Sequence, residues 1–108
     1  MLVTIQNVCS VGGTITAPPS KSMAHRAVLC AALAEGRSHI TNLEFSKDIS
    51  ATLGAAAQLC ARLRTGADDA VVEGLGHFVP LAAPVDCCES GSTLRFLIPI
   101  ASLTGQAV

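Results

Sequence analysis

Lysine, serine and arginine side chains gather in residues 18–26, and their spacing suits the binding of an anion. Two prolines end any preceding element, and Ser20 directly after them is a natural N-cap for a helix. Lys21, Ser22 and Arg26 therefore fall in the first turns of that predicted helix, where free backbone N–H groups point outward. An ammonium, a hydroxyl and a bidentate guanidinium are suitable donors for phosphate and carboxylate groups. We predict half of an anion-binding pocket here.

The charge of Lys21 can be interpreted in two ways. A cation at a helix N-terminus opposes the helix dipole and costs about 0.3–1 kcal/mol unless an anion joins it. The lysine is therefore either a solvated charge on an ordinary capped helix or a contact for an anionic ligand. The residues of this turn alone leave both interpretations open.

A second turn, residues 89–95, places three hydroxyl side chains around Gly91 and just before an apolar run. The glycine would let a ligand approach the backbone, and the hydroxyls and N–H groups would act as donors. The stretch is neither a Walker phosphate-binding loop nor a G-x-S-x-G nucleophile elbow. A serine-capped helix after a loop would have the same sequence, so this turn is a weak motif by itself.

Composition excludes several classes of protein. The 108 residues suffice for one small domain, half of them are hydrophobic, 14% are charged and the net charge is −1. Such a chain buries a core and offers nucleic acid neither a basic surface nor, with three phenylalanines, a stacking platform. No signal peptide and no run of membrane-spanning length is visible. We expect a cytoplasmic protein that binds neither nucleic acid nor membrane.

The five cysteines and three histidines match no zinc-ligand spacing, so no metal site is predicted. An odd number of cysteines without C-x-x-C spacing is typical of reduced thiols in the cytosol. Cys30 and Cys60 lie in apolar runs predicted to be helical, and we expect both to be small core residues. His25 lies beside the candidate pocket and could contact a ligand or act as acid or base, although a structural or surface role is the commoner one.

Periodicity and turn residues indicate an α/β or α+β arrangement. The predicted elements are strands at 2–7, 14–16, 37–43 and 70–74, an edge segment at 77–81, and helices at 21–35, 46–62 and 96–103. Pro99 should kink the last helix or start a new turn. The last residues, Gln106 to Val108, look like the start of another strand, so we expect the chain to be a piece of a longer protein.

Both turns resemble the N-terminal part of the 5-enolpyruvylshikimate-3-phosphate synthases. The matching positions, in family order, are residues 19–22, 25–27 and 31–36, then Asn42, Ser46 and Asp48, and finally residues 90–95. The S-K-S-x-x-x-R motif is intact, whereas His25 stands where many members carry asparagine. Two ordered motifs are more specific than either alone, and the resemblance covers essentially the whole chain.

The resemblance implies a fold and an activity. The family has two domains built from repeated βαβαββ-type units, so residues 1–17 would belong to the other, C-terminal domain. Residues 18–108 would then be an incomplete first substrate-binding domain. The family transfers the enolpyruvyl group of phosphoenolpyruvate to the 5-hydroxyl of shikimate 3-phosphate, in the shikimate pathway of aromatic amino-acid biosynthesis. Its members need no metal or organic cofactor and are typically monomeric.

By motif match, the resemblance implies substrate-binding roles for Lys21, Ser22, Arg26, Glu89, Gly91 and Ser92. Lys21 would contact both substrates, Ser22 and Arg26 would hold shikimate 3-phosphate, and Gly91 would approach phosphoenolpyruvate. Glu89 and Ser92 would line the second turn.

The resemblance also implies that the groups which move protons are elsewhere. In family order, the acid and base residues of the reaction are expected beyond Val108, the last residue of this chain. We therefore expect no catalytic residue in this chain and no activity from it alone.

Two alternatives belong to other classes. The chain could be a standalone anion-binding module, or a structural fragment without catalysis. The related enolpyruvyl transferase that acts on a UDP-sugar shares the architecture, but its N-terminal motif does not read S-K-S-x-x-x-R.

Overall fold

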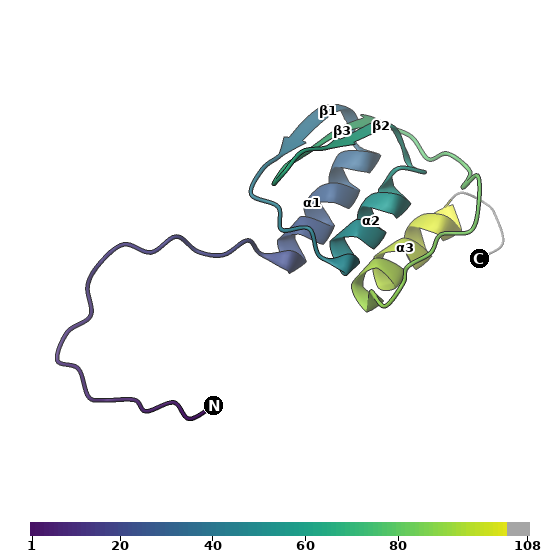
Figure 1. Ribbon diagram of the computed structural model, residues 1–108. Coiled ribbons are helices and arrows are strands. Elements are labelled where there is room, and N and C mark those ends of the chain that lie inside the picture. The colour runs from purple at the N-terminus through teal and green to yellow at the C-terminus, as the bar shows by residue number, and fades with distance from the viewer. Residues whose placement is uncertain (104–108) are drawn as a thin grey trace.

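A small antiparallel sheet lies over two of three helices, and the third helix lies beside them, in the computed structural model, which describes residues 1–103 (Figure 1). The elements are α1 (Lys21–Leu33), β1 (Glu35–Ile40), α2 (Lys47–Ala56), β2 (Cys60–Thr65), β3 (Ala70–Leu75) and α3 (Gly91–Leu103). The strand order is β1-β3-β2 and both pairings are antiparallel. The mixed α and β character predicted from the sequence is therefore confirmed.

Each helix begins directly after a serine that caps it. The hydroxyls of Ser20, Ser46 and Ser90 accept hydrogen bonds from the backbone N–H three residues further on, at 3.4, 3.3 and 3.2 Å. Such a cap satisfies one of the free N–H groups of the first turn. The three helix starts are thus fixed by local sequence.

The core lies between the sheet and the helices, where Val28, Ile49, Leu59 and Val72 are completely or almost completely buried. Helix α1 packs very closely on β3 at Gly74. A methyl group at this glycine would collide with the carbonyl oxygens of the α1 C-terminal end. Gly74 therefore lets the central strand approach the helix that carries the first predicted turn.

The predicted strands at 2–7 and 14–16 are wrong for this structure. Residues 1–20 contain no helix or strand, and Figure 1 shows residues 1–17 running away from the body of the molecule. Large apolar side chains in this segment are exposed, among them Leu2, Ile5 and Ile15. A strand is stabilised by pairing with a neighbour, and no described residue pairs with this segment.

Other boundaries also differ from the predictions. The second helix ends at Ala56 instead of continuing to 62, because residues 60–65 pair with β3 as a hairpin whose turn spans 66–69. Tertiary pairing here overrides the helix propensity of an alanine-rich run. The predicted edge segment at 77–81 is not a strand.

At the C-terminal end of the chain, the structure tests the predicted start of the third helix but not the strand predicted at 106–108. The third helix begins five residues earlier than predicted and contains Pro99. The strand expected to start at residues 106–108 lies outside the described part of the chain, since the description ends at residue 103. The same holds for Val108, beyond which the acid and base groups are expected, so their position stays a prediction.

The expectation that Cys30 and Cys60 are helical core residues holds only in part, since Cys30 is helical but not in the core, and Cys60 packs against the core but is not helical. Cys30 is exposed on α1, and Cys60 is half-buried at the start of β2. The run that contains Cys30 is so rich in alanine that its composition did not show which face is buried. All five cysteines are free thiols.

Candidate functional site

The N-terminal ends of the three helices lie along one edge of the molecule. Figure 1 shows α1, α2 and α3 side by side and pointing the same way, with their first turns on the side away from the sheet. Each first turn carries free N–H groups and the positive end of a helix dipole. Three such ends together favour negative charge, so this edge is the candidate binding site.

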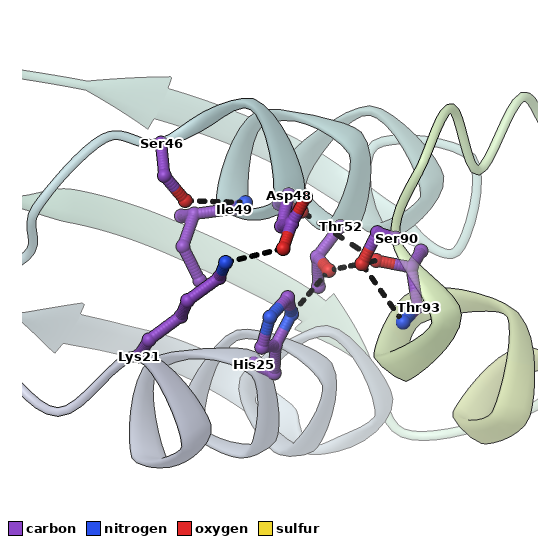
Figure 2. A network of polar contacts seen from close by, with 8 residues as sticks. All are labelled: Lys21, His25, Ser46, Asp48, Ile49, Thr52, Ser90 and Thr93. Carbon is purple, nitrogen blue, oxygen red and sulfur yellow. Dashed lines mark hydrogen bonds and ion pairs between the residues drawn. The ribbon is translucent and has the colours of Figure 1, made fainter.

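Lys21 and Asp48 form an ion pair between the first turns of α1 and α2 (Figure 2). The ammonium of Lys21 is about half exposed, and the carboxylate of Asp48 is more buried. The cation that opposes the α1 dipole therefore has an anionic partner within the chain. Asp48 was identified from the sequence only as one of the positions that match the resembling family, because nothing local shows that α2 starts beside Lys21.

A chain of buried polar side chains connects the three helices. His25 Nδ1 of α1 lies 2.7 Å from Thr52 Oγ1 of α2, which lies 2.7 Å from Thr93 Oγ1 of α3. The Thr93 hydroxyl in turn donates to Ser90 Oγ at 2.6 Å and lies 3.5 Å from the Asp48 carbonyl oxygen. Figure 2 shows these side chains pointing toward one another from three separate helices. The two turns predicted from the sequence are thus joined through α2.

His25 is 2% exposed, and its pKa is lowered from the ordinary value of 6.5. Burial is the main cause, because it disfavours the charged imidazolium. Lys21 and Arg26 lower the pKa further, whereas Asp48 raises it. Among the described residues, Nε2 of His25 is the one buried side-chain nitrogen or oxygen without a hydrogen-bond partner. The ring is therefore a structural histidine rather than a surface one.

Arg26 is exposed and turned toward α3. Its Nη1 donates to the Ser22 carbonyl oxygen at 2.8 Å, and its guanidinium carbon lies 5.3 Å from the centroid of the Phe96 ring. These contacts orient the guanidinium through a backbone oxygen and an aromatic ring. The side chain of Ser22 is exposed in the first turn of the same helix. Both predicted residues are therefore accessible at the site edge.

The second predicted turn forms the start of α3. Gly91 is the first residue of that helix, and a methyl group there would meet only Arg95 Nη2, at 3.6 Å. The structure therefore does not need a glycine at this place for its own packing. Glu89 is exposed and Ser92 is half-buried. An open space remains in front of the Gly91 backbone.

Two hollows flank the start of α2. A pocket of about 140 Å³ lies beside Lys21 and reaches Glu44 and Ser46. An open pocket of about 690 Å³ lies on the other side, where Lys47 and Glu89 are among its lining residues. Lys21 and Glu89 are thus predicted site residues that line hollows. The smaller hollow lies directly beside the lysine of the first motif, and the Glu44 carboxylate is also part of its lining.

Sequence reasoning missed two members of the polar chain, Thr52 and Thr93. A threonine inside the otherwise apolar stretch of α2 is the one signal that could have indicated Thr52, because a buried hydroxyl needs a partner. Thr93 was noted only as a possible donor to a ligand. Among residues 1–103, no group of three or more potential ligand side chains is placed to hold a metal ion, and no helix is long and apolar enough to cross a bilayer.

Fold and site together define a chain of mixed α and β structure whose helix N-termini lie along one edge, with a lysine and an arginine on the first of these helices. The sequence model of the family EPSP synthase (3-phosphoshikimate 1-carboxyvinyltransferase) matches residues 5–108. The chain belongs to this family.

Curated relatives carry the same family name. A 3-phosphoshikimate 1-carboxyvinyltransferase of Clostridium beijerinckii is 47% identical over an alignment of 100 residues, and the match covers 86% of this chain and 23% of the relative. Those of Clostridium kluyveri and Clostridioides difficile are 41% and 45% identical, over 94% and 83% of this chain and 24% and 23% of the relatives. The chain therefore spans about a quarter of the length of the relatives it matches.

Proposed function

We propose that this chain supplies one wall of the substrate site of an enolpyruvyl transferase. The transferase would move the enolpyruvyl group of phosphoenolpyruvate to the 5-hydroxyl of shikimate 3-phosphate. The observation that supports this most directly is the joining of the Lys21 turn and the Gly91 turn at one edge of three aligned helices. Both substrates are anionic, and this edge presents cationic side chains and helix dipoles to them.

The proposed reaction is an addition followed by an elimination. The 5-hydroxyl gives up its proton to a base while its oxygen bonds to C2 of phosphoenolpyruvate, and C3 takes up a proton from an acid, which gives a tetrahedral intermediate. Loss of a proton from C3 and departure of phosphate from C2 then restore the double bond in the product. The residues of this chain would bind the anionic groups of the substrates in both steps. Lys21 would contact both substrates, and Ser22 and Arg26 would bind shikimate 3-phosphate.

The second turn would bind phosphoenolpyruvate. The open space at Gly91 would admit one of its anionic groups to the first N–H groups of α3. Ser92 and Glu89 would line the same turn. The Asp48 carboxylate would compete with an incoming anion for the Lys21 ammonium, so binding would require the lysine to be shared or released.

The rest of the site would come from parts of the protein outside this chain. We propose the two-domain architecture of the family, in which residues 1–17 join the other domain and residues 18–108 begin the first one. The exposed apolar side chains of residues 2–15 support this, because they would be buried by pairing with a further sheet. The acid and base groups would lie beyond Val108, so the chain alone would bind a substrate without turning it over.

A titration of the 108-residue chain with shikimate 3-phosphate tests the proposal. Lys21→Ala and Arg26→Ala should each weaken binding about tenfold or more, because each removes a charge-assisted hydrogen bond. Arg64→Ala is the matched control, since Arg64 is exposed on β2 at the sheet. A folded wild-type chain that binds no shikimate 3-phosphate would exclude the half-site and favour a purely structural role. Phosphate release above background by this chain would contradict its proposed inactivity.

A further inference from the structure

The polar chain between the helices has a direction, which follows from counting protons. Thr93 Oγ1 has one proton, and its acceptors are Ser90 Oγ at 2.6 Å and the more distant Asp48 carbonyl oxygen. A hydroxyl that donates its only proton there must accept from its other neighbour. Thr52 therefore donates to Thr93 and in turn accepts from His25. The ring proton of His25 is consequently on Nδ1.

This direction gives His25 a defined task at the other end of the chain. Ser90 Oγ accepts from both the hydroxyl and the backbone N–H of Thr93, at 2.6 and 3.2 Å. These bonds fix the serine that caps α3 directly before Gly91. His25 lies in α1, one turn after Lys21. The histidine thus holds the start of one substrate-binding turn against the start of the other.

We propose that His25 is a positioning residue, which acts as a neutral Nδ1–H donor through Thr52 and Thr93 to fix the Ser90 cap of α3 relative to α1. It touches no substrate in this role, because it is 2% exposed and its contacts are inside the helix layer. The catalytic value of this role rests on the proposed function, whereas the positioning itself does not.

Two substitutions at this position separate the polar role from simple filling of space. Asparagine places an amide nitrogen the same number of bonds from Cα as Nδ1, and it lacks the unpartnered Nε2. Leucine has a comparable volume but cannot donate. His25→Asn should therefore keep the bond to Thr52, whereas His25→Leu should break it.

The experiment is hydrogen exchange by NMR on the full 108-residue chain without ligand. In His25→Leu, the amides of Thr93 and Leu94 should exchange about tenfold faster relative to the amides of β3, because the α3 cap loses support. In His25→Asn they should stay within about twofold of wild type. Should His25→Leu fail to fold, Thr52→Val removes the middle hydroxyl at nearly constant volume and should give the same selective acceleration.

The ring itself supplies a second readout, because long-range ¹⁵N–¹H correlation distinguishes the two imidazole nitrogens. The wild type should show a protonated Nδ1 and a bare Nε2. A proton on Nε2 would overturn the proposal. Equal acceleration of amide exchange in α3 and β3 of His25→Leu would also overturn it, and so would equally fast exchange of the Thr93 and Leu94 amides in His25→Asn and His25→Leu. Failure of the wild type to bind shikimate 3-phosphate would contradict the proposed function but not the positioning role of His25, since the exchange experiment needs no ligand.

Discussion

Lys21 and Asp48 face each other as an ion pair across the first turns of α1 and α2, which positions a lysine and a carboxylate at the same anion-attracting edge. The pair removes the conflict between the Lys21 charge and the helix dipole while no ligand is bound. It also means that any anionic ligand must compete with a carboxylate that is already in place.

Replacing the carboxylate should lower stability and raise anion affinity. Asp48→Asn leaves Lys21 without its partner, and since the lysine is half exposed the loss should be about 0.3–1 kcal/mol. Inorganic phosphate should bind this variant more tightly than wild type and restore the lost stability. Urea denaturation with and without phosphate measures both effects. Asp68→Asn, on the exposed β2–β3 turn, is the control and should change neither.

The lowered pKa of His25 should make stability depend on pH. Above the unfolded pKa of 6.5 the ring is neutral in both states and its contacts contribute fully. As pH falls from 6.5 toward the lower folded pKa, the unfolded state takes up a proton first, so stability decreases. His25→Asn should lose this part of the pH dependence. Thermal unfolding of both proteins between pH 7.5 and 5 checks this, and parallel curves would contradict the burial of a neutral ring.

Gly91→Ala should separate binding from folding. A methyl group at this position meets only Arg95 Nη2 at 3.6 Å, and alanine is favourable in a helix, so the melting temperature should not fall. The same methyl group would occupy the space proposed for an anion at the α3 N-terminus. Titration with phosphoenolpyruvate should therefore show weaker binding in a variant with unchanged circular dichroism. Unchanged affinity would exclude close approach of this substrate to the Gly91 backbone.

Two other glycines should respond in opposite directions. Gly74→Ala forces a Cβ atom into the carbonyl oxygens of Ala31 and Ala34, and should destabilise the chain by about 1–3 kcal/mol. Gly54→Ala adds a methyl group to an exposed place in α2 with nothing within 4 Å, and should stabilise it by about 0.5–1 kcal/mol. Chemical denaturation compares them directly. Equal effects would show that α1 and β3 are not packed as described.

Features encoded in neighbouring residues were predictable. Ser20 caps a helix as predicted, and the strand predicted at 70–74 is confirmed. The strand at 60–65 was not predictable, because these residues directly follow an alanine-rich helical run and have no pattern of their own that distinguishes them from a continuing helix. Its pairing with β3 decides the matter. The prediction for residues 2–7 was wrong in the opposite direction. Their alternation of side chains is typical of a strand, but no described residue pairs with them.

The sequence by itself determined where the first two helices begin and which residues stand in their first turns, because capping and helix dipoles act within a few residues. It therefore placed Lys21 at a helix start, whereas it set the start of the third helix five residues too late and left Gly91 in the turn before it. Only the tertiary structure decided that Asp48 lies beside Lys21 and that His25 reaches Ser90 through two threonines. These contacts join residues far apart in the chain. They depend on how the three helices pack side by side, which no local pattern encodes.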